Sequence, residues 1–396
     1  MPHTPASPRF SRRAGRIKIS ATKLMPMLAA EVGGCVSLGQ GVPSFATPDF
    51  VVDAVCAALR HDPAAGKYSL QPGLPDLRRA VAGLLAHEKG LHADPVGEIL
   101  IAVGAMEALL AAMLVLVDRG DEVIVPAPSY PSHVEQILLA EGTPVFARLR
   151  PDFSLDPEAV ARAVTEKTRA IIVSSPHNPT GAVFAEPDLR AVADIAIRHD
   201  LTVICDDTYD SLSYDAPAFS LAALPELRER LVAVGSFSKR FALTGWRVGH
   251  AFAPRPIMDQ MLKIHDCATI CAPMPGQIAA LAALTGPQDV FTGFARTLAR
   301  RRDLACRRLD ALAGHLDYIR PAGAFYVMAR YHEDIPPMDM AVRLIREAGV
   351  ITIPGDAFGP GGEQSLRLSF GAAETELNEA FDRLEEFFGR ERGETF

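Results

Sequence analysis

The sequence lacks an excess of positive charge, and this absence weighs against one broad class of partner. Its 40 lysines and arginines are outnumbered by 48 aspartates and glutamates, so the formal net charge is −8. Proteins that bind nucleic acids gather basic side chains on one surface. The arginine pairs at 301–302 and 307–308 stand at helical spacing among leucines and alanines, which is typical of a solvated helix face. We therefore expect no nucleic-acid partner.

The sequence also lacks the patterns that mark secreted, metal-binding and membrane proteins. Its six cysteines show no paired metal-ligand spacing and are too sparse for a disulfide scaffold. The N-terminal arginines are not followed by an apolar core with a cleavage site. The long apolar run from Ile99 to Val117 is interrupted by Gly104 and Glu107, which fits a buried strand leading through a turn into a core helix. We expect a cytoplasmic protein with reduced thiols, no metal and no membrane partner.

Helical patterns alternate with short apolar runs between about residues 50 and 285. Helices are expected from Asp49 to Arg60 and from Leu74 to about Glu88. The strand-like runs are apolar on both faces and cover residues 99–103, 122–125, 143–146, 170–174, 202–205 and 231–235. Strands of this kind, joined by helices, form a mostly parallel sheet that is covered on both sides. Ligands of such sheets bind beyond the carboxyl ends of the strands.

The pattern changes after about residue 285. A long helix is expected from Val290 to Ala313 and a charged helix from Glu374 to Arg390. Shorter strands are expected at residues 316–320, 325–329, 350–353 and 366–370. The 396 residues are enough for two domains, and the second is a smaller α+β unit.

The most informative segment runs from Ser236 to Gly249. Lys239 follows Ser236 and Ser238 closely, and Arg247 comes eight residues later, directly after the only tryptophan. A lysine amine beside hydroxyls and a guanidinium suits an aldehyde that also carries a phosphate. The amine bonds to the aldehyde carbon, while the two serines and the arginine bind the dianion. That aldehyde is pyridoxal 5′-phosphate.

This segment closely resembles the lysine signature of the class I and II aminotransferases, the fold-type-I enzymes that use pyridoxal phosphate. The resemblance implies a three-layer αβα large domain with a mostly parallel sheet and a smaller α+β domain. We expect residues 46–285 to form the large cofactor-binding domain and residues 12–45 with 286–396 to form the small one. Residues 1–11 are expected to be a mobile tail.

Two strand ends carry further motifs of this family. Asp206 and Tyr209 follow the run 202–205, and the resemblance makes Asp206 the partner of the protonated ring nitrogen and Tyr209 the phenol that hydrogen-bonds the ring 3-hydroxyl. Asp207 would then have a structural or supporting role. Asn178 lies in an Asn-Pro-Thr-Gly turn after the run 170–174. It matches the asparagine that binds the 3-oxygen of the cofactor and faces the substrate carboxylate.

The resemblance assigns five more residues around the cofactor. Gly104, Ala105 and Met106 match the phosphate turn at a helix N-terminus, where backbone amides suit an anion. Tyr130 matches the aromatic residue that stacks on the pyridine face. Tyr68 matches a tyrosine that reaches the phosphate in the neighbouring subunit, which implies a homodimer with shared active sites.

Three further residues complete the expected site. Arg367 matches the arginine that clamps the substrate α-carboxylate with two parallel hydrogen bonds. Gly41 lies in a loop that resembles the one whose backbone closes over the substrate. His133 matches a histidine that supports the aspartate in some relatives, although a lone histidine in a loop is often solvated. The sequence leaves both interpretations of His133 open.

These motifs occur in family order from about Ser37 to Phe370 and predict a pyridoxal-phosphate-dependent aminotransferase of amino acid metabolism. It would move an amino group from an L-amino acid to a 2-oxo acid by a ping-pong mechanism, with Lys239, Asp206 and Tyr209 as catalytic residues. A lyase or a decarboxylase of the same fold would use most of the same residues. A non-catalytic regulatory module with the same fold is the other alternative.

Met106 bears on the choice of donor. In bacterial aspartate aminotransferases of the type that this sequence resembles, a lysine that helps to bind a second carboxylate often stands at this position. The side chain of Met106 is apolar, and an unpaired buried carboxylate is costly. We therefore expect a neutral or aromatic donor, with 2-oxoglutarate or pyruvate as acceptor, and an aspartate-type enzyme is the alternative.

Overall fold

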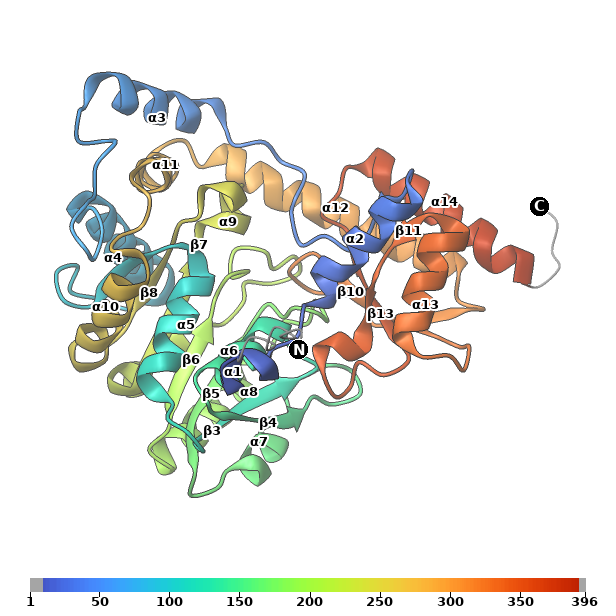
Figure 1. The fold of residues 1–396 in the computed structure, drawn as a ribbon, viewed down its shortest axis with the longest axis horizontal. Coiled ribbons are helices and arrows are strands. Elements are labelled where there is room, and N and C mark those ends of the chain that lie inside the picture. The colour runs from blue at the N-terminus through green and yellow to red at the C-terminus, as the bar shows by residue number, and fades with distance from the viewer. Residues whose placement is uncertain (1–9, 392–396) are drawn as a thin grey trace, which may run out of the picture.

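The computed structural model describes residues 10–391, which form three β-sheets covered by helices (Figure 1). The largest sheet has the strand order β2-β8-β7-β6-β5-β3-β4. Its strands are β2 (Ile99–Ala102), β3 (Glu122–Ala127), β4 (Thr143–Arg148), β5 (Thr168–Ser174), β6 (Thr202–Asp206), β7 (Leu231–Ser236) and β8 (Gly249–Phe252). Neighbouring strands are parallel except at β8, which is antiparallel to both β2 and β7. The predicted α/β fold with a mostly parallel sheet is confirmed.

Side chains of the large sheet alternate between two buried apolar clusters, one on each face. On β6, Val203 and Cys205 belong to one cluster and Ile204 to the other. The first face is covered by α3 (Asp49–His61), α4 (Pro75–Lys89), α7 (Pro157–Ala163), α8 (Glu186–Arg198) and α11 (Met274–Thr285). The second face is covered by α5 (Gly104–Leu116), α6 (Pro131–Leu139) and α10 (Arg255–Thr269). Burial on both faces is the reason that these strands are apolar without alternation.

The strand β8 was not predicted. Its four residues, Gly249 to Phe252, are too few and too mixed to give a periodic signal. The apolar run that begins at Ile99 folds as expected: β2 leads through Val103 into α5. Within residues 10–391, no helix combines the length and the apolar character that a membrane crossing requires.

A third buried cluster lies around a four-stranded antiparallel sheet of order β12-β13-β10-β9. The elements of this part are α2 (Ala21–Val32), β1 (Val36–Ser37), β9 (Leu316–Tyr318), β10 (Tyr326–Tyr331), α13 (Pro337–Arg343), β11 (Val350–Ile351), β12 (Ile353–Pro354), β13 (Ser365–Ser369) and α14 (Glu374–Glu391). The single strand expected at 350–353 is divided, because β11 pairs with β1 whereas β12 pairs with β13.

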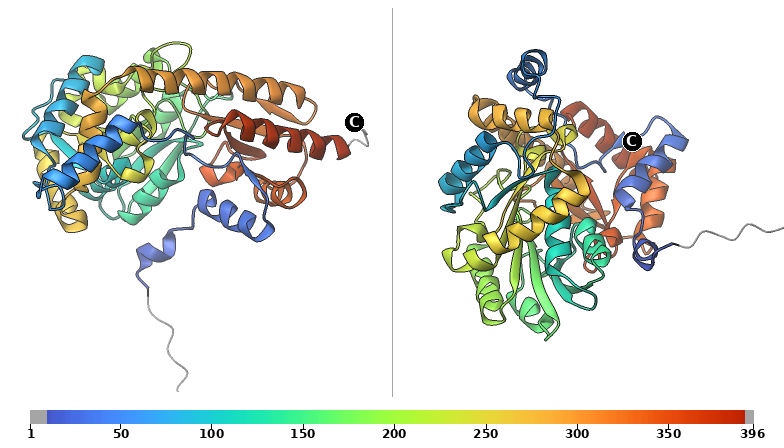
Figure 2. Two further views of the ribbon diagram at one scale, coloured as in Figure 1. Left: turned by 90° about the horizontal axis from the view of Figure 1, so that it is seen from above. Right: turned by 60° about the vertical axis from the view of Figure 1, so that its left-hand side comes forward.

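The long helix α12 (Asp289–Ala311) joins the two parts of the molecule. Its first turn contributes Phe291 to a cluster of the large sheet, and Leu298, Ala305 and Leu309 belong to the third cluster. Figure 2 shows α12 running alongside α14. This distribution supports the proposed division near residue 285, which stays a prediction. Of the expected tail 1–11, residues 1–9 lie outside the described residues, and Ser11 caps α1 (Arg12–Arg16).

Candidate active site

A cavity of about 690 Å³ lies at the carboxyl ends of β5, β6 and β7 and is also lined by residues of β10 and β13. It brings together almost all of the predicted site residues. The lining includes Gly41, Ala105, Met106, Tyr130, Asn178, Asp206, Tyr209, Ser236, Ser238, Lys239, Arg247 and Arg367. Gly104 adjoins this set, because a Cβ atom on it would lie 2.7 Å from an Nη atom of Arg247. Tyr68 is not among the lining residues and is 76% exposed.

Lys239 enters the cavity from α9 (Phe237–Arg240), a single turn that follows β7 directly. The Ser236 hydroxyl caps this turn by accepting a hydrogen bond from the backbone N–H of Ser238 (3.1 Å). Nζ of Lys239 donates to the carbonyl oxygen of Gly41 (2.5 Å). Burial, together with the charges of Arg367 and Arg247, lowers the pKa of Lys239 to about 8. Such an amine is partly neutral, and therefore nucleophilic, near physiological pH.

The anion-binding groups of the cavity lie around the start of α5. Gly104 has a φ of +73° and leaves room for the guanidinium of Arg247. The hydroxyls of Ser236 and Ser238 and the first residues of α5 line the same cavity. Among the described residues that line it, Asp206 is the single carboxylate. Hydroxyls, a guanidinium and the N-terminus of a helix form a donor set that fits a phosphate dianion.

Asp206 is buried at the end of β6 and accepts several hydrogen bonds. Nε2 of His133 lies 3.0 Å from Oδ2 of Asp206, and the Thr208 hydroxyl donates to Oδ1 (2.6 Å). Burial acts to raise the pKa of Asp206, but the hydrogen bonds from His133 and Thr208 outweigh it, so this pKa lies below the usual range. His133 is only 1% exposed, so the interpretation of this residue as a solvated loop histidine is wrong.

Tyrosines line the cavity from both sheets. The hydroxyls of Tyr209 and Tyr326 lie 2.8 Å apart, and burial raises the pKa of Tyr209 well above its usual value. The Tyr130 hydroxyl donates to the sulfur of Met106 (3.7 Å). A Cβ atom on Gly41 would lie 2.5 Å from the Tyr326 hydroxyl, so the loop can approach this tyrosine only because residue 41 is glycine.

Arg367 is a buried cation whose hydrogen bonds are incomplete. Its Nη atoms donate to Oδ1 of Asn178 (3.1 Å) and to the carbonyl oxygen of Gly39 (2.6 Å). The guanidinium carbon lies 4.4 Å from the centre of the Tyr326 ring. Nε of Arg367 has no hydrogen-bond partner among the described residues, although the residue is only 2% exposed. Arg367 lines the cavity, and a buried cation with incomplete hydrogen bonds is suited to an anionic ligand such as a carboxylate.

The cavity is also lined by residues that were not predicted from the sequence, among them Thr208, Tyr326, Thr22, Lys23 and Pro26. Thr208 lies within the Asp206–Tyr209 motif and could have been found there. The other four belong to α2 and β10 and reach the cavity only through the packing of the third cluster.

The residues present fit pyridoxal phosphate. A lysine of lowered pKa can bond to an aldehyde, the donor set around α5 can bind a phosphate, and ionised Asp206 can face a protonated ring nitrogen. Each of these groups lines the same cavity.

Comparisons with known proteins point to one family. The family model described as "Aminotransferase class I and II" matches residues 34–384. An aspartate aminotransferase of Pyrococcus abyssi is 36% identical over 95% of this chain and 97% of its own length. An aromatic-amino-acid aminotransferase of Thermococcus litoralis is 35% identical over 95% of this chain and 97% of its own length. A solved structure of Thermus thermophilus aspartate aminotransferase with maleate superimposes with a TM-score of 0.90 at 35% identity, over 96% of this chain and 100% of that one.

Proposed function

This chain belongs to the class I and II aminotransferases and is a pyridoxal-phosphate-dependent aminotransferase, and on that basis we propose that Lys239, Asp206 and Tyr209 perform the reaction in the cavity described above. Its substrates are amino acids and 2-oxo acids. The observation that carries the assignment of residues is a partly buried lysine with a pKa of about 8 that shares one cavity with ionised Asp206 and incompletely bonded Arg367.

When bound, pyridoxal phosphate supplies an aldehyde that takes up the amino group and a ring that accepts the electron pair left at Cα. Lys239 would hold the cofactor through its amine until an amino acid displaced that amine. The freed Nζ would then take the proton from the substrate Cα and pass it to the carbon that had been the aldehyde carbon of the cofactor. The lowered pKa of Lys239 suits this task, because the amine must be neutral to accept a proton.

The other residues bind and orient. Asp206, supported by His133, would keep the ring nitrogen protonated, and Tyr209 and Asn178 would bind the 3-oxygen. Tyr130 would stack on the ring face. The phosphate would be bound by Gly104, Ala105, Met106, Ser236, Ser238 and Arg247, and by Tyr68 of a second copy of the chain. Arg367 and Asn178 would bind the substrate α-carboxylate, over which the backbone of Gly41 would close.

An assay of reaction type separates this function from the alternatives on the same fold. We expect transfer of the amino group to depend on an added 2-oxo acid and to yield equal amounts of the new amino acid and the new 2-oxo acid. Release of ammonia, thiol or carbon dioxide without a requirement for a 2-oxo acid would indicate a lyase or a decarboxylase instead.

The donor is proposed to be neutral or aromatic, because Met106 offers an apolar surface beside Tyr130. Steady-state kinetics test this. We expect kcat/KM for phenylalanine, leucine or methionine to equal or exceed the value for aspartate, and a much higher value for aspartate would contradict the proposal.

An aspartate-type enzyme is the second candidate, and Lys23 favours it. Among the described residues that line the cavity, the cations are Lys23, Lys239, Arg247 and Arg367, and the last three already have proposed roles. Lys23 could pair with the second carboxylate of a dicarboxylic substrate. If it does, Lys23→Met will lower kcat/KM for aspartate about tenfold relative to phenylalanine, whereas Lys18→Met, five residues earlier and outside the cavity lining, will not.

A homodimer with shared active sites is part of the proposal. Tyr68 and Leu70, near the expected phosphate contact, are 76% and 63% exposed in the single chain, which suits residues that a second copy would cover. A cytoplasmic location also stays a proposal, supported by six cysteines without a disulfide.

A further inference from the structure

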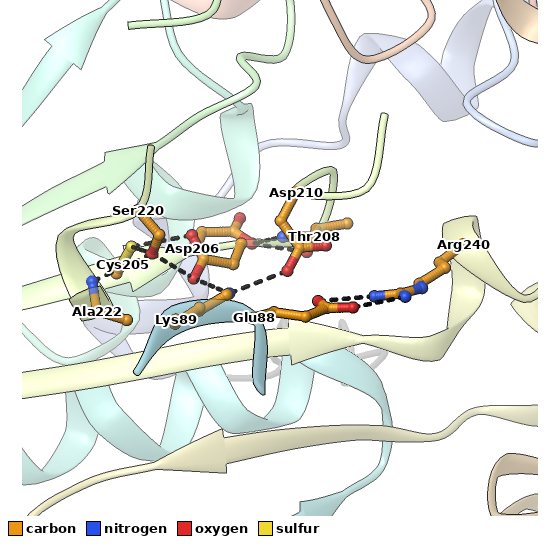
Figure 3. A network of polar contacts seen from close by, with 10 residues as sticks. Glu88, Lys89, Cys205, Asp206, Thr208, Asp210, Ser220, Ala222 and Arg240 are labelled. Atoms are coloured by element: carbon orange, nitrogen blue, oxygen red, sulfur yellow. Dashed lines mark hydrogen bonds and ion pairs between the residues drawn. The ribbon is translucent and has the colours of Figure 1, made fainter. Parts of the chain in front are cut away.

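The last turn of α4 contacts the two chain segments that carry the central residues of the site, on the side away from the cavity. Figure 3 shows Glu88 and Lys89 at this helix end, with Ser220 and Asp210 above them and Arg240 to the right of Glu88. The helix stops at Gly90, which has a φ of +64° and caps the helix through its backbone N–H. Glu88 and Lys89 are therefore the final residues of a helix of 15 residues, anchored on the large sheet by buried Leu77, Val81 and Leu85.

Lys89 binds the turn that carries Asp206 and Tyr209. Its Nζ lies 2.5 Å from Oδ2 of Asp207 and 2.9 Å from Oδ2 of Asp210. The side chains of Lys89 and Asp207 are only 9% and 2% exposed. Burial acts to lower the pKa of Lys89, but Asp207 and Asp210 outweigh it and raise this pKa above its usual value. The lysine therefore stays charged and holds both carboxylates.

Asp207 is held by two further side chains. Sγ of Cys205 donates to Oδ1 of Asp207 (3.0 Å), and the Ser220 hydroxyl donates to Oδ2 (2.9 Å). With Lys89, these contacts satisfy both oxygens of a carboxylate that has almost no access to water. A buried carboxylate with all partners in place has little freedom to move, so the turn that contains it is fixed.

Glu88 binds the segment that carries Lys239. Its two carboxylate oxygens accept from the two Nη atoms of Arg240, at 2.9 and 2.6 Å. Arg240 directly follows Lys239 and is the last residue of α9, a helix of four residues. So short a helix has little stability of its own. The bidentate contact between Glu88 and Arg240 is therefore important for its position.

Residues of the two segments line two different cavities. Asp206, Tyr209 and Lys239 line the large cavity, whereas Asp210 and Arg240 line a second, polar cavity of about 420 Å³ together with Glu88 and Lys89. In each segment, the residue proposed to react lines the first cavity, and a residue that binds the end of α4, Asp210 or Arg240, lines the second.

We propose that Glu88 and Lys89 are positioning residues for the reaction: one helix end fixes the distance between the amine of Lys239 and the carboxylate of Asp206. The proposal rests on the roles proposed above for these two residues. In pyridoxal phosphate, the aldehyde carbon and the ring nitrogen stand at opposite positions of one rigid aromatic ring. A protein that must meet both atoms needs their two partners held at one separation, within about 0.5 Å. Lys239 and Asp206 follow different strands. The end of α4 binds the residue directly after each of them, Arg240 and Asp207.

The test compares Glu88→Gln and Lys89→Met with a matched control, Glu98→Gln. Both carboxylate oxygens of Glu98 accept from Nη2 of Arg228, at 2.8 and 2.7 Å, so Glu98 also pairs with an arginine, but its hydrogen bonds reach neither segment. Cofactor-free protein is titrated with pyridoxal phosphate, and the holoenzyme is titrated with pH to find the midpoint of the spectral change of the bound cofactor. Melting temperature and kcat and KM for a 2-oxo acid are measured in parallel.

We expect Glu88→Gln and Lys89→Met to weaken cofactor binding about tenfold, to shift the spectral midpoint, and to lower kcat about tenfold with little change in KM. Glu98→Gln should change melting temperature alone. Lys89→Arg keeps the charge, so its cofactor affinity and kcat should stay within about threefold of those of the natural protein. If Lys89→Met does not fold, Lys89→Arg and Glu88→Gln are used for the test. The proposal would be overturned if Glu88→Gln had the same cofactor affinity and the same spectral midpoint as Glu98→Gln. A natural protein that binds no pyridoxal phosphate would instead overturn the function on which it rests.

Discussion

Nη1 of Arg367 donates to Oδ1 of Asn178 at 3.1 Å, and this contact joins strand β13 of the four-stranded sheet to the loop after β5 of the large sheet. The two residues lie 189 positions apart in the sequence. Both line the cavity, so a ligand carboxylate bound there would contact both parts of the molecule at once. If the substrate binds this pair as we propose, its binding depends on the relative position of the two sheets.

Replacing Arg367 by lysine should lower kcat/KM for the amino donor about 100-fold. The ammonium group cannot reproduce the two parallel hydrogen bonds and leaves Asn178 or Gly39 without its present donor. Steady-state kinetics with one donor measure the loss. Arg330→Lys, an exposed arginine on β10, is the control and should leave kcat/KM unchanged. Equal values for both variants would contradict the assignment of Arg367.

Lys239 should be the residue that bonds to the cofactor. Lys239→Ala should lower turnover by more than about 1000-fold while still binding pyridoxal phosphate weakly, because the phosphate site is intact. Borohydride reduction of the yellow holoenzyme, followed by peptide mapping, should label Lys239. Label on another lysine would show that the assignment is wrong.

The amine of Lys239 should titrate near pH 8 in the cofactor-free protein, well below the usual 10.5 of a lysine. Burial, Arg367 and Arg247 all disfavour the charged form, so the neutral amine gains population as pH rises through 8. Competitive labelling with an amine reagent, with exposed Lys263 as internal reference, measures this. Reactivity that rises only above pH 10 would contradict it.

Asp206 and Asp207 should differ sharply in their effects. Asp206→Ala should lower kcat about 100-fold or more, because the ring nitrogen loses the carboxylate that keeps it protonated. Asp207→Ala should retain much more turnover but lower the free energy of unfolding by about 3 kcal/mol, because Lys89 stays buried with one partner fewer. Turnover and urea unfolding are measured for both variants. Equal losses of turnover would show that the choice between these neighbours is wrong.

The stability of the fold should fall as pH falls from about 6.5 toward 4. Burial and Lys89 lower the pKa of His250 to about 4, and burial and His133 lower that of His177 to about 3. In this window both histidines bind protons more readily in the unfolded chain than in the folded chain. Each histidine therefore lowers the free energy of unfolding by about 3 kcal/mol at pH 4. Urea unfolding from pH 7 to pH 4 measures the loss. His250→Asn should reduce the slope of the free energy of unfolding against pH by the equivalent of one proton. An unchanged slope would contradict the prediction.

The protein should sediment as a dimer. Tyr68→Phe should leave the dimer intact but weaken cofactor binding about fivefold, because one hydrogen bond to the phosphate is lost. Analytical ultracentrifugation and cofactor titration measure the two effects. A fully active monomer would contradict the shared active site.

The sequence by itself determined which groups we propose to bind the cofactor. Lys239, Ser236, Ser238 and Arg247 stand within one short segment, and Asp206 and Tyr209 within another, so their chemistry could be recognised without knowing what lies across the cavity. The sequence also determined the large sheet, because strands buried on both faces must be apolar throughout. Placing these motifs at carboxyl ends of parallel strands was enough to predict that they meet.

Only the tertiary structure decided which distant residues support them. Nothing local distinguishes His133 from a solvated histidine or Lys89 from a surface lysine, yet one is hydrogen-bonded to Asp206 and the other is buried between two carboxylates. The short strand β8 is likewise fixed by its pairing with β2 and β7 rather than by its own four residues. Contacts between residues far apart in the chain depend on how whole elements pack, and a sequence pattern records only what each element needs for itself.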